Sequence, residues 1–130
     1  MEALMQTQNV STDKSKPMNI STSMQACIDN CTSCYQICAH MITYCLEKGG
    51  LHAKSKHIQL LQDCAKICEV SANFMIRESN FHNLTCGACA KICIACAESC
   101  EAFSDDDMMK SCAEICRKCA KSCEEMAKMQ

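Results

Sequence analysis

The chain has 130 residues, with 13 basic and 15 acidic side chains and a net charge of −2, which suits a single domain of ordinary size. Sixteen residues are Cys and ten are Met, so sulfur residues outnumber the 21 Leu, Ile, Val and Phe. Three Gly and one Pro are too few for a loop-rich disulfide scaffold. The absence of Trp, together with only two Arg, argues against nucleic-acid binding, and no apolar run is long enough to span a membrane. Cysteine must therefore line the core, as a protonated thiol can.

Residues 1–21 carry no Cys and contain the only proline, Pro17, so we expect a flexible N-terminal tail before a domain at 22–130. This segment has neither the Arg pair nor the apolar stretch that is typical of an export signal. We therefore expect a cytoplasmic protein. In that compartment thiols stay reduced, and dense cysteine usually indicates metal binding.

Between positions 27 and 123 the cysteines fall into runs whose members are mostly three or four residues apart. Cys27, Cys31, Cys34 and Cys38 form one such run, and Cys86 to Cys100 form another. This heptad-like spacing places the side chains on one stripe of an α-helix. The stripe that contains Cys64 and Cys68 has fewer thiols and continues through Ser71 and Met75.

Breaks in the pattern predict where the helices begin and end. Thr22 with Gln25 resembles a capping box that opens the first helix, and Gly49-Gly50 ends it. Further helices are expected at about 52–78 and 81–103. A fourth should run from about 104 to 128, opened by Ser104 and an acidic run that we interpret as a helix start only. Four helices with short connections predict an all-α, antiparallel up-down-up-down four-helix bundle with a Cys-lined core.

Seven CxxxC pairs lie within these stripes, and side chains at i and i+4 of a helix are neighbours with Cβ atoms about 5–6 Å apart. Two such sulfurs can hold one soft metal ion between them, which suits Cu(I) in a reducing compartment. The candidate ligands are Cys27, Cys31, Cys34, Cys38, Cys45, Cys64, Cys68, Cys86, Cys89, Cys93, Cys96, Cys100, Cys112, Cys116, Cys119 and Cys123. Possible additional ligands are Met41, Met75, His57 and His82. His40 and His52 fall off the stripes and are expected to be solvated.

Charge favours copper over zinc. Sixteen buried thiolates would carry −16, and one Cu(I) per thiolate would bring that to zero, whereas four Zn²⁺ would leave −8. The alternatives are a zinc reservoir, an iron–sulfur protein, a disulfide scaffold and cysteines that only fill the core. A redox or single-ion transfer protein is a further alternative, but it would need an exposed CxxC pair. No catalytic constellation is evident, so we expect a binding protein and not an enzyme.

The stripes CIDNCTSCYQIC, CGACAKICIACAESC and CAEICRKCAKSC resemble those of the bacterial copper storage proteins, a family of Cys-lined four-helix bundles. The resemblance covers about residues 22–128. It implies storage of multiple Cu(I) ions along the bundle axis, commonly in a homotetramer. Because the export signal is lacking, the chain is similar to the cytosolic branch. Ser71 and Met75 depart from the pattern, so we expect copper to pack less densely beside them.

The predicted topology brings the ends of the stripes together at two poles. Met24, Met75, His82 and Met126 share one end, the Met75 pole, and His57, Leu61, Phe103 and Met109 share the other, the His57 pole. Soft, uncharged ligands at the Met75 pole predict that copper enters there and passes to Cys27, Cys86 and Cys123. Leu61 and Phe103 are expected to plug the His57 pole. A copper chaperone or a chelator would receive the ions on release.

Overall fold

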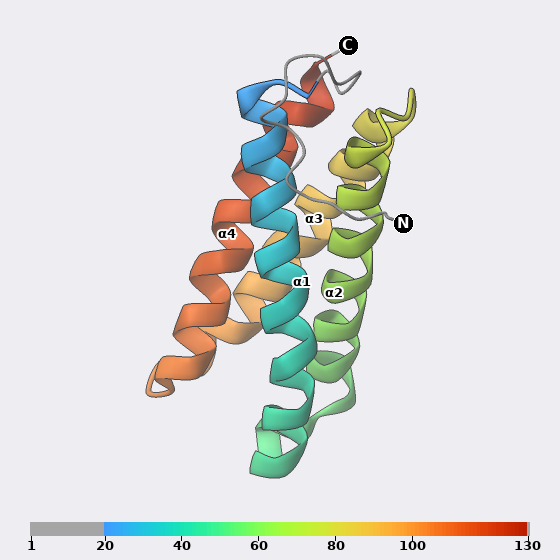
Figure 1. Ribbon diagram of the computed structural model, residues 1–130. Helices are drawn as coiled ribbons and strands as arrows, with labels where there is room; N and C mark the ends of the chain where they lie inside the picture. Colours follow the sequence, from blue (N-terminus) through green and yellow to red (C-terminus); the bar gives the residue numbers. More distant parts are fainter. Residues whose placement is uncertain (1–19, 130) are drawn as a thin grey trace, which may run out of the picture.

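The computed structural model describes residues 20–129 and contains four long helices (Figure 1). These are α1 (Thr22–Lys48), α2 (Ser55–Ile76), α3 (His82–Glu101) and α4 (Asp107–Lys128), and a short 3₁₀ helix, η2 (Gly50–Ala53), lies between α1 and α2. The predicted tail falls outside the described residues except for its last two positions. Within the described range, none of the helices is both long and apolar enough to cross a membrane.

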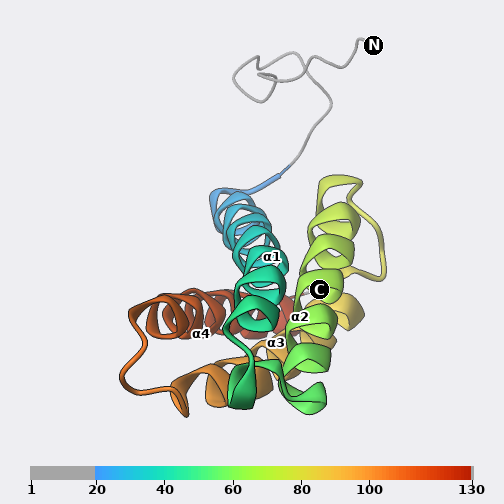
Figure 2. The same ribbon diagram turned by 90° about the horizontal axis from the view of Figure 1, so that it is seen from below.

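The helices form the predicted antiparallel bundle. Helix α1 packs against α2 and α4, and α3 packs against the same two helices, so each helix has two neighbours around the axis (Figure 2). The short connections η2, 77–81 and 102–106 force consecutive helices to run in opposite directions. The beginnings of α1 and α3 therefore lie at the Met75 pole, and their ends lie at the His57 pole.

The helix ends differ in detail from the prediction. Ser21, one residue before the predicted capping box, caps α1 by accepting a hydrogen bond from the Met24 N–H at 3.1 Å. Helix α4 begins at Asp107, because the carboxylate of Asp106 caps the Met108 and Met109 N–H groups. Ser104 is not the cap.

Helix α2 also begins later than predicted. Gly49 and Gly50 both adopt positive φ, which reverses the chain into η2 before α2 starts at Ser55.

Sulfur-containing side chains make up most of the core. All sixteen cysteines are fully buried, as are Met41, Leu61, Met75 and Met109. Buried Ala residues on the flanks of the stripes fill the space between helices: Ala65, Ala72, Ala90, Ala97, Ala113 and Ala120. The charged residues of α4 that the stripe pattern placed outside are exposed: Glu114, Lys118, Lys121 and Glu125. The helical stripe thus decides which side chains reach the axis.

Candidate metal centre

The thiols of different helices meet along the bundle axis. Cys31 of α1 lies with its Sγ 3.5 Å from that of Cys123 and 3.6 Å from that of Cys119, both on α4. On the α2–α3 side, the Sγ of Cys68 lies 3.6 Å from those of both Cys89 and Cys93. All sixteen cysteines are free thiols. Each helix therefore contributes sulfur to one shared interior.

Five groups of three or four thiols have all their sulfurs within 4.8 Å of one another. They are Cys27/Cys86/Cys123, Cys31/Cys89/Cys119/Cys123, Cys68/Cys89/Cys93/Cys119, Cys34/Cys64/Cys68/Cys93 and Cys34/Cys38/Cys64/Cys116. Each group shares at least one sulfur with the next along the axis. Twelve of the sixteen thiols thus form a continuous array, and Cys45, Cys96, Cys100 and Cys112 lie outside the five groups.

Fewer CxxxC pairs bring their two sulfurs together than the sequence spacing suggested. Three of the seven, Cys34/Cys38, Cys89/Cys93 and Cys119/Cys123, have sulfurs 3.8–4.0 Å apart, and a fourth, Cys64/Cys68, belongs to one of the five groups. Most of the short sulfur–sulfur distances join different helices, a feature that the spacing within one helix cannot reveal.

These separations fit metal coordination. Metal–thiolate bonds of about 2.3 Å place the sulfurs of one trigonal or tetrahedral site roughly 4 Å apart. The distances between contacting thiols, 3.5–4.0 Å, are close to that value. Little movement of the side chains would be needed to bind metal along the axis.

The thiols of the array perturb one another's protonation. Hydrogen bonds with Cys123 and Cys27 lower the pKa of Cys86 to about 4. Hydrogen bonds with Cys112 and Cys116 raise the pKa of Cys38 above its ordinary value. Burial raises the pKa of Cys45, outside the five groups, to about 11. The thiols of the array thus shift one another's pKa in both directions, whereas Cys45, whose pKa burial raises, keeps its proton at neutral pH until a metal displaces it.

Ser71 occupies the stripe position in α2 where a thiol would complete the lining. It is fully buried, and its Oγ lies 3.3 Å from the Sγ of Cys86. Met75, one turn further, is also fully buried. A hydroxyl and a thioether therefore replace two potential thiolates next to the Cys27/Cys86/Cys123 group.

At the His57 pole the structure assembles ligands of three kinds. The Nε2 of His57 lies 3.5 Å from the Sγ of Cys45, and the Sδ of Met109 lies 3.8 Å from the same sulfur. The Nδ1 of His57 is 2.6 Å from the Oγ of Ser99, a partner that orients the ring with Nε2 toward Cys45. Burial, helped by nearby His52, lowers the pKa of His57, so the imidazole is neutral. The stripe pattern did not identify Ser99, or Met109 as a partner of Cys45.

The Met75 pole ends in thioether and imidazole side chains. Met75 and Met126 are buried beneath half-buried Met24 and His82. Met24 and His82 line a cavity of about 260 Å³ with Met129 and the α2–α3 turn. The Nδ1 of His82 is 3.0 Å from the carbonyl oxygen of Ser79, to which it donates when that nitrogen carries the proton, and Nε2 is then unprotonated. The three thiols expected to receive copper here, Cys27, Cys86 and Cys123, form one group.

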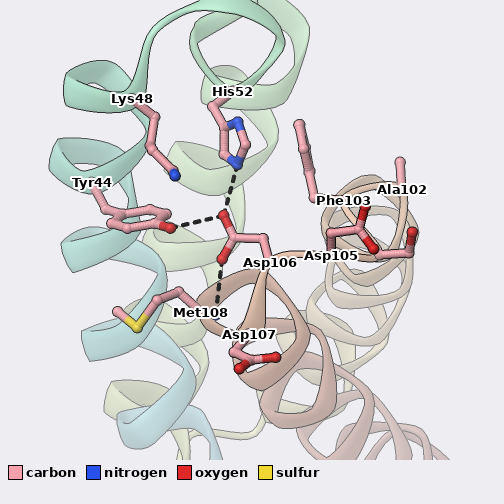
Figure 3. Close-up of a pocket in the computed structure, with 10 residues that line it drawn as sticks. Tyr44, Lys48, His52, Ala102, Phe103, Asp105, Asp106, Asp107 and Met108 are labelled. Carbon is pink, nitrogen blue, oxygen red and sulfur yellow. Dashed lines mark hydrogen bonds and ion pairs between the residues drawn. The ribbon is translucent and has the colours of Figure 1, made fainter.

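Two sequence-based expectations about the His57 pole are wrong. His52 is not freely solvated but partly buried: its ring packs on Phe103 at 4.0 Å between centroids, and its Nε2 lies 2.8 Å from Oδ2 of Asp106 (Figure 3). Asp106 does more than start a helix, because the same oxygen accepts a hydrogen bond from the Tyr44 hydroxyl at 2.8 Å. Tertiary packing brings these residues together across more than 50 positions of sequence. His40, by contrast, is exposed as expected.

The comparisons with known proteins agree with this architecture. A family model described as copper storage protein matches residues 20–128. A crystal structure of a protein from Nitrosospira multiformis is 46% identical, with a TM-score of 0.78, over 83% of this chain and 97% of that one. No curated protein matches the chain significantly.

Two further solved structures carry a described function. Apo copper storage protein 3 from Bacillus subtilis is 39% identical, with a TM-score of 0.72, over 79% of this chain and 97% of that one. The copper storage protein Ccsp from Streptomyces lividans, loaded with 10 copper equivalents, is 28% identical, with a TM-score of 0.77, over 86% and 92%. The family model spans most of the chain, including every cysteine of the buried thiol array. The chain belongs to the copper storage protein family.

Proposed function

We propose that this protein stores many Cu(I) ions inside its four-helix bundle, in the cytoplasm. The observation that carries the proposal is the chain of five overlapping thiol groups, each with its sulfurs within 4.8 Å of one another. Because neighbouring groups share sulfurs, one thiolate can bridge two copper ions. All sixteen thiols are fully buried, so stored ions would be kept from water and from unintended partners.

Charge supports a monovalent ion. Without metal, the buried thiols are neutral when they are protonated, and each Cu(I) that replaces a proton leaves the core neutral again. Tetrahedral Zn²⁺ bound by four thiolates would leave two negative charges per site in the interior. The shared sulfurs also disfavour zinc, since structural zinc sites use separate sets of four ligands. The redox and single-ion transfer alternatives are disfavoured because all four CxxC pairs of the sequence are fully buried: Cys31/Cys34, Cys86/Cys89, Cys93/Cys96 and Cys116/Cys119.

We assign the sixteen cysteines as the copper ligands, and His57 as an additional ligand beside Cys45. The Cys45–His57 distance of 3.5 Å and the neutral, oriented imidazole support His57. Met75 and His82 would bind copper transiently at the Met75 pole, where the cavity beside Met24 gives access. Met41, buried on the α1 stripe, completes the candidate set. A crystal structure of the copper-loaded protein tests each assignment directly.

Titration with Cu(I) against a competing chelator tests storage. We expect saturation at on the order of one ion per cysteine, because neutrality favours one Cu(I) per thiolate. Saturation at four ions or fewer would rule out storage. A parallel titration with Zn²⁺ should leave the array only partly occupied.

We propose storage without catalysis, an assembly of four identical subunits, and release to a copper chaperone or a small chelator. Circular dichroism of the reduced, copper-free protein should already show a helical spectrum, since protonated cysteines pack as small apolar residues. A random-coil spectrum would mean that copper binding creates the fold. Sedimentation velocity measures the number of subunits in the assembly.

A further inference from the structure

The His57 pole is closed by aromatic side chains from two separate loops. Phe103, in the α3–α4 connection, lies between His52 of η2 and His57 of α2, with ring centroids 4.0 Å and 5.0 Å away. His57 is only 4% exposed and faces Cys45. Phe103 and His52 therefore form the cover between the last candidate ligands of the array and solvent.

One carboxylate holds this cover in place (Figure 3). Oδ2 of Asp106 accepts hydrogen bonds from the Tyr44 hydroxyl of α1 and from the His52 Nε2 of η2, both at 2.8 Å. Its Oδ1 accepts from the Met108 and Met109 N–H groups at 2.9 and 3.2 Å. A single side chain thus joins the end of α1, η2 and the start of α4.

The attachment of η2 can be broken without disturbing the core. No residue of η2 is buried, and among the described elements η2 lies close only to α1 and α2. It follows Gly49, and that residue and Gly50 both have positive φ. Side-chain contacts of His52 therefore tie η2 to Phe103 and Asp106, and their loss would leave the thiol array intact.

Phe103 also separates two surface cavities. One, of about 540 Å³, is lined by Tyr44, Lys48, His52 and the acidic run before α4. The other, of about 630 Å³, is lined by Leu51, His57 and Leu60. Phe103 lines both. His57 is only 4% exposed to the second cavity, and rotation of the Phe103 ring away from His52 would join the two cavities and widen the path to His57.

We propose that Tyr44, His52 and Asp106 form a latch that holds Phe103 over the His57 pole, and that release of this latch sets the rate of copper exchange at Cys45 and His57. The inference rests on the proposed storage function. It assigns these three residues a positioning role, since none of them binds the metal. The latch keeps the His57 pole closed to chelators while the Met75 pole exchanges copper.

The test uses a Tyr44→Phe, His52→Ala double variant, which removes both donors but keeps the Asp106 helix cap. His40→Ala, on the exposed face of α1, is the matched control. Copper removal by a chelator is followed by stopped flow on fully loaded protein, and total capacity is measured on the same samples. We expect removal to be about tenfold faster in the double variant with unchanged capacity, because hydrogen bonds to a charged group are being lost. Removal within twofold of the control would overturn the role of the latch in copper exchange.

Amide hydrogen exchange of residues 50–53 in the copper-free protein gives a second readout that does not depend on copper. Exchange should accelerate in the double variant and in Asp106→Asn, which keeps a capping side chain but removes the charge. Unchanged exchange in both variants would overturn the latch. Faster exchange with unchanged copper removal would overturn its gating role. A wild-type capacity of four ions or fewer would instead overturn the storage function, and hydrogen exchange would still report on the contacts themselves.

Discussion

The two poles of the bundle are built from different chemistry. The Met75 pole ends in thioethers and an imidazole around a small open cavity, next to three clustered thiols. The His57 pole ends in a buried imidazole beside Cys45, covered by stacked rings and held by the Asp106 carboxylate. The same helical stripes thus end in soft, uncharged ligands at one pole and beneath an aromatic cover at the other. The soft ligands at both poles belong to the helical stripes, whereas the cover of the His57 pole comes from the connections that hold His52, Phe103 and Asp106.

The largest effect is expected at the His57 pole. Leu61 is fully buried there, so Leu61→Ala should lower the free energy of unfolding by about 2–5 kcal/mol through the cavity that it leaves. Met75→Leu, at the opposite pole, conserves volume and should cost less than about 1.5 kcal/mol. Urea denaturation of the reduced, copper-free proteins measures both. Equal losses would show that packing does not distinguish the poles in this way.

A glycine near each pole offers a matched pair of substitutions, one in a turn and one in a helix. Gly49 has φ 73° and ψ −168°, a region that is nearly restricted to glycine, so Gly49→Ala should cost roughly 1–3 kcal/mol. Gly87 lies in α3 near the Met75 pole, and an added Cβ would meet Ala127 Cβ at an ordinary 3.8 Å. Gly87→Ala should therefore stabilise the protein by about 0.5–1 kcal/mol. Thermal melts report both, and a stabilising Gly49→Ala would contradict the backbone argument.

Copper uptake tests which pole is the entrance. A Met75→Leu, His82→Phe double variant removes the neutral ligands of the Met75 pole and should slow uptake by about tenfold, the effect of losing roughly 1.4 kcal/mol of transient binding. Stopped-flow loading and unloading measure the rates, with Leu61→Ala as the comparison. If the double variant exchanges copper at the wild-type rate while Leu61→Ala speeds both steps, the entrance is at the His57 pole.

The smallest effect distinguishes two helix caps at opposite poles. Ser21→Ala and Asp106→Ala should each cost about 1 kcal/mol. Only the stability difference caused by Asp106→Ala should depend on pH in the acidic range. Burial acts to raise the pKa of the Asp106 carboxyl, but hydrogen bonds from Tyr44, His52 and two backbone N–H groups outweigh it and lower the pKa to about 2.

The sign of that dependence follows from linkage. The lowered pKa means that the Asp106 carboxylate contributes stability that is fully present above the unfolded value of 3.8 and is lost as the pH falls through about 2. The difference between wild type and Asp106→Ala should shrink over that range, whereas the Ser21→Ala difference should stay constant. Urea midpoints between pH 2 and pH 5 measure this. A constant Asp106→Ala difference would contradict the lowered pKa.

The sequence alone determined the helices and the face that each of them buries. Steps of three and four residues place Cys27 to Cys38 on one side of the chain only if that chain is helical. Short connections then require consecutive helices to run antiparallel. The sequence also determined that sulfur-containing side chains would fill most of the interior. Burial of all sixteen cysteines confirms this, because no other apolar residue type was numerous enough to fill the core.

Only the tertiary structure decided which sulfurs meet. The sequence pattern emphasised CxxxC pairs within one helix, but the short distances join Cys31 to Cys123 and Cys68 to Cys93 across helices. The relative rotation and height of the helices set those contacts, and no spacing within one helix encodes them. The pairing of His52 with Asp106 likewise depends on how two loops meet at one pole. Local periodicity specifies a stripe, whereas contacts between stripes are fixed by packing in three dimensions.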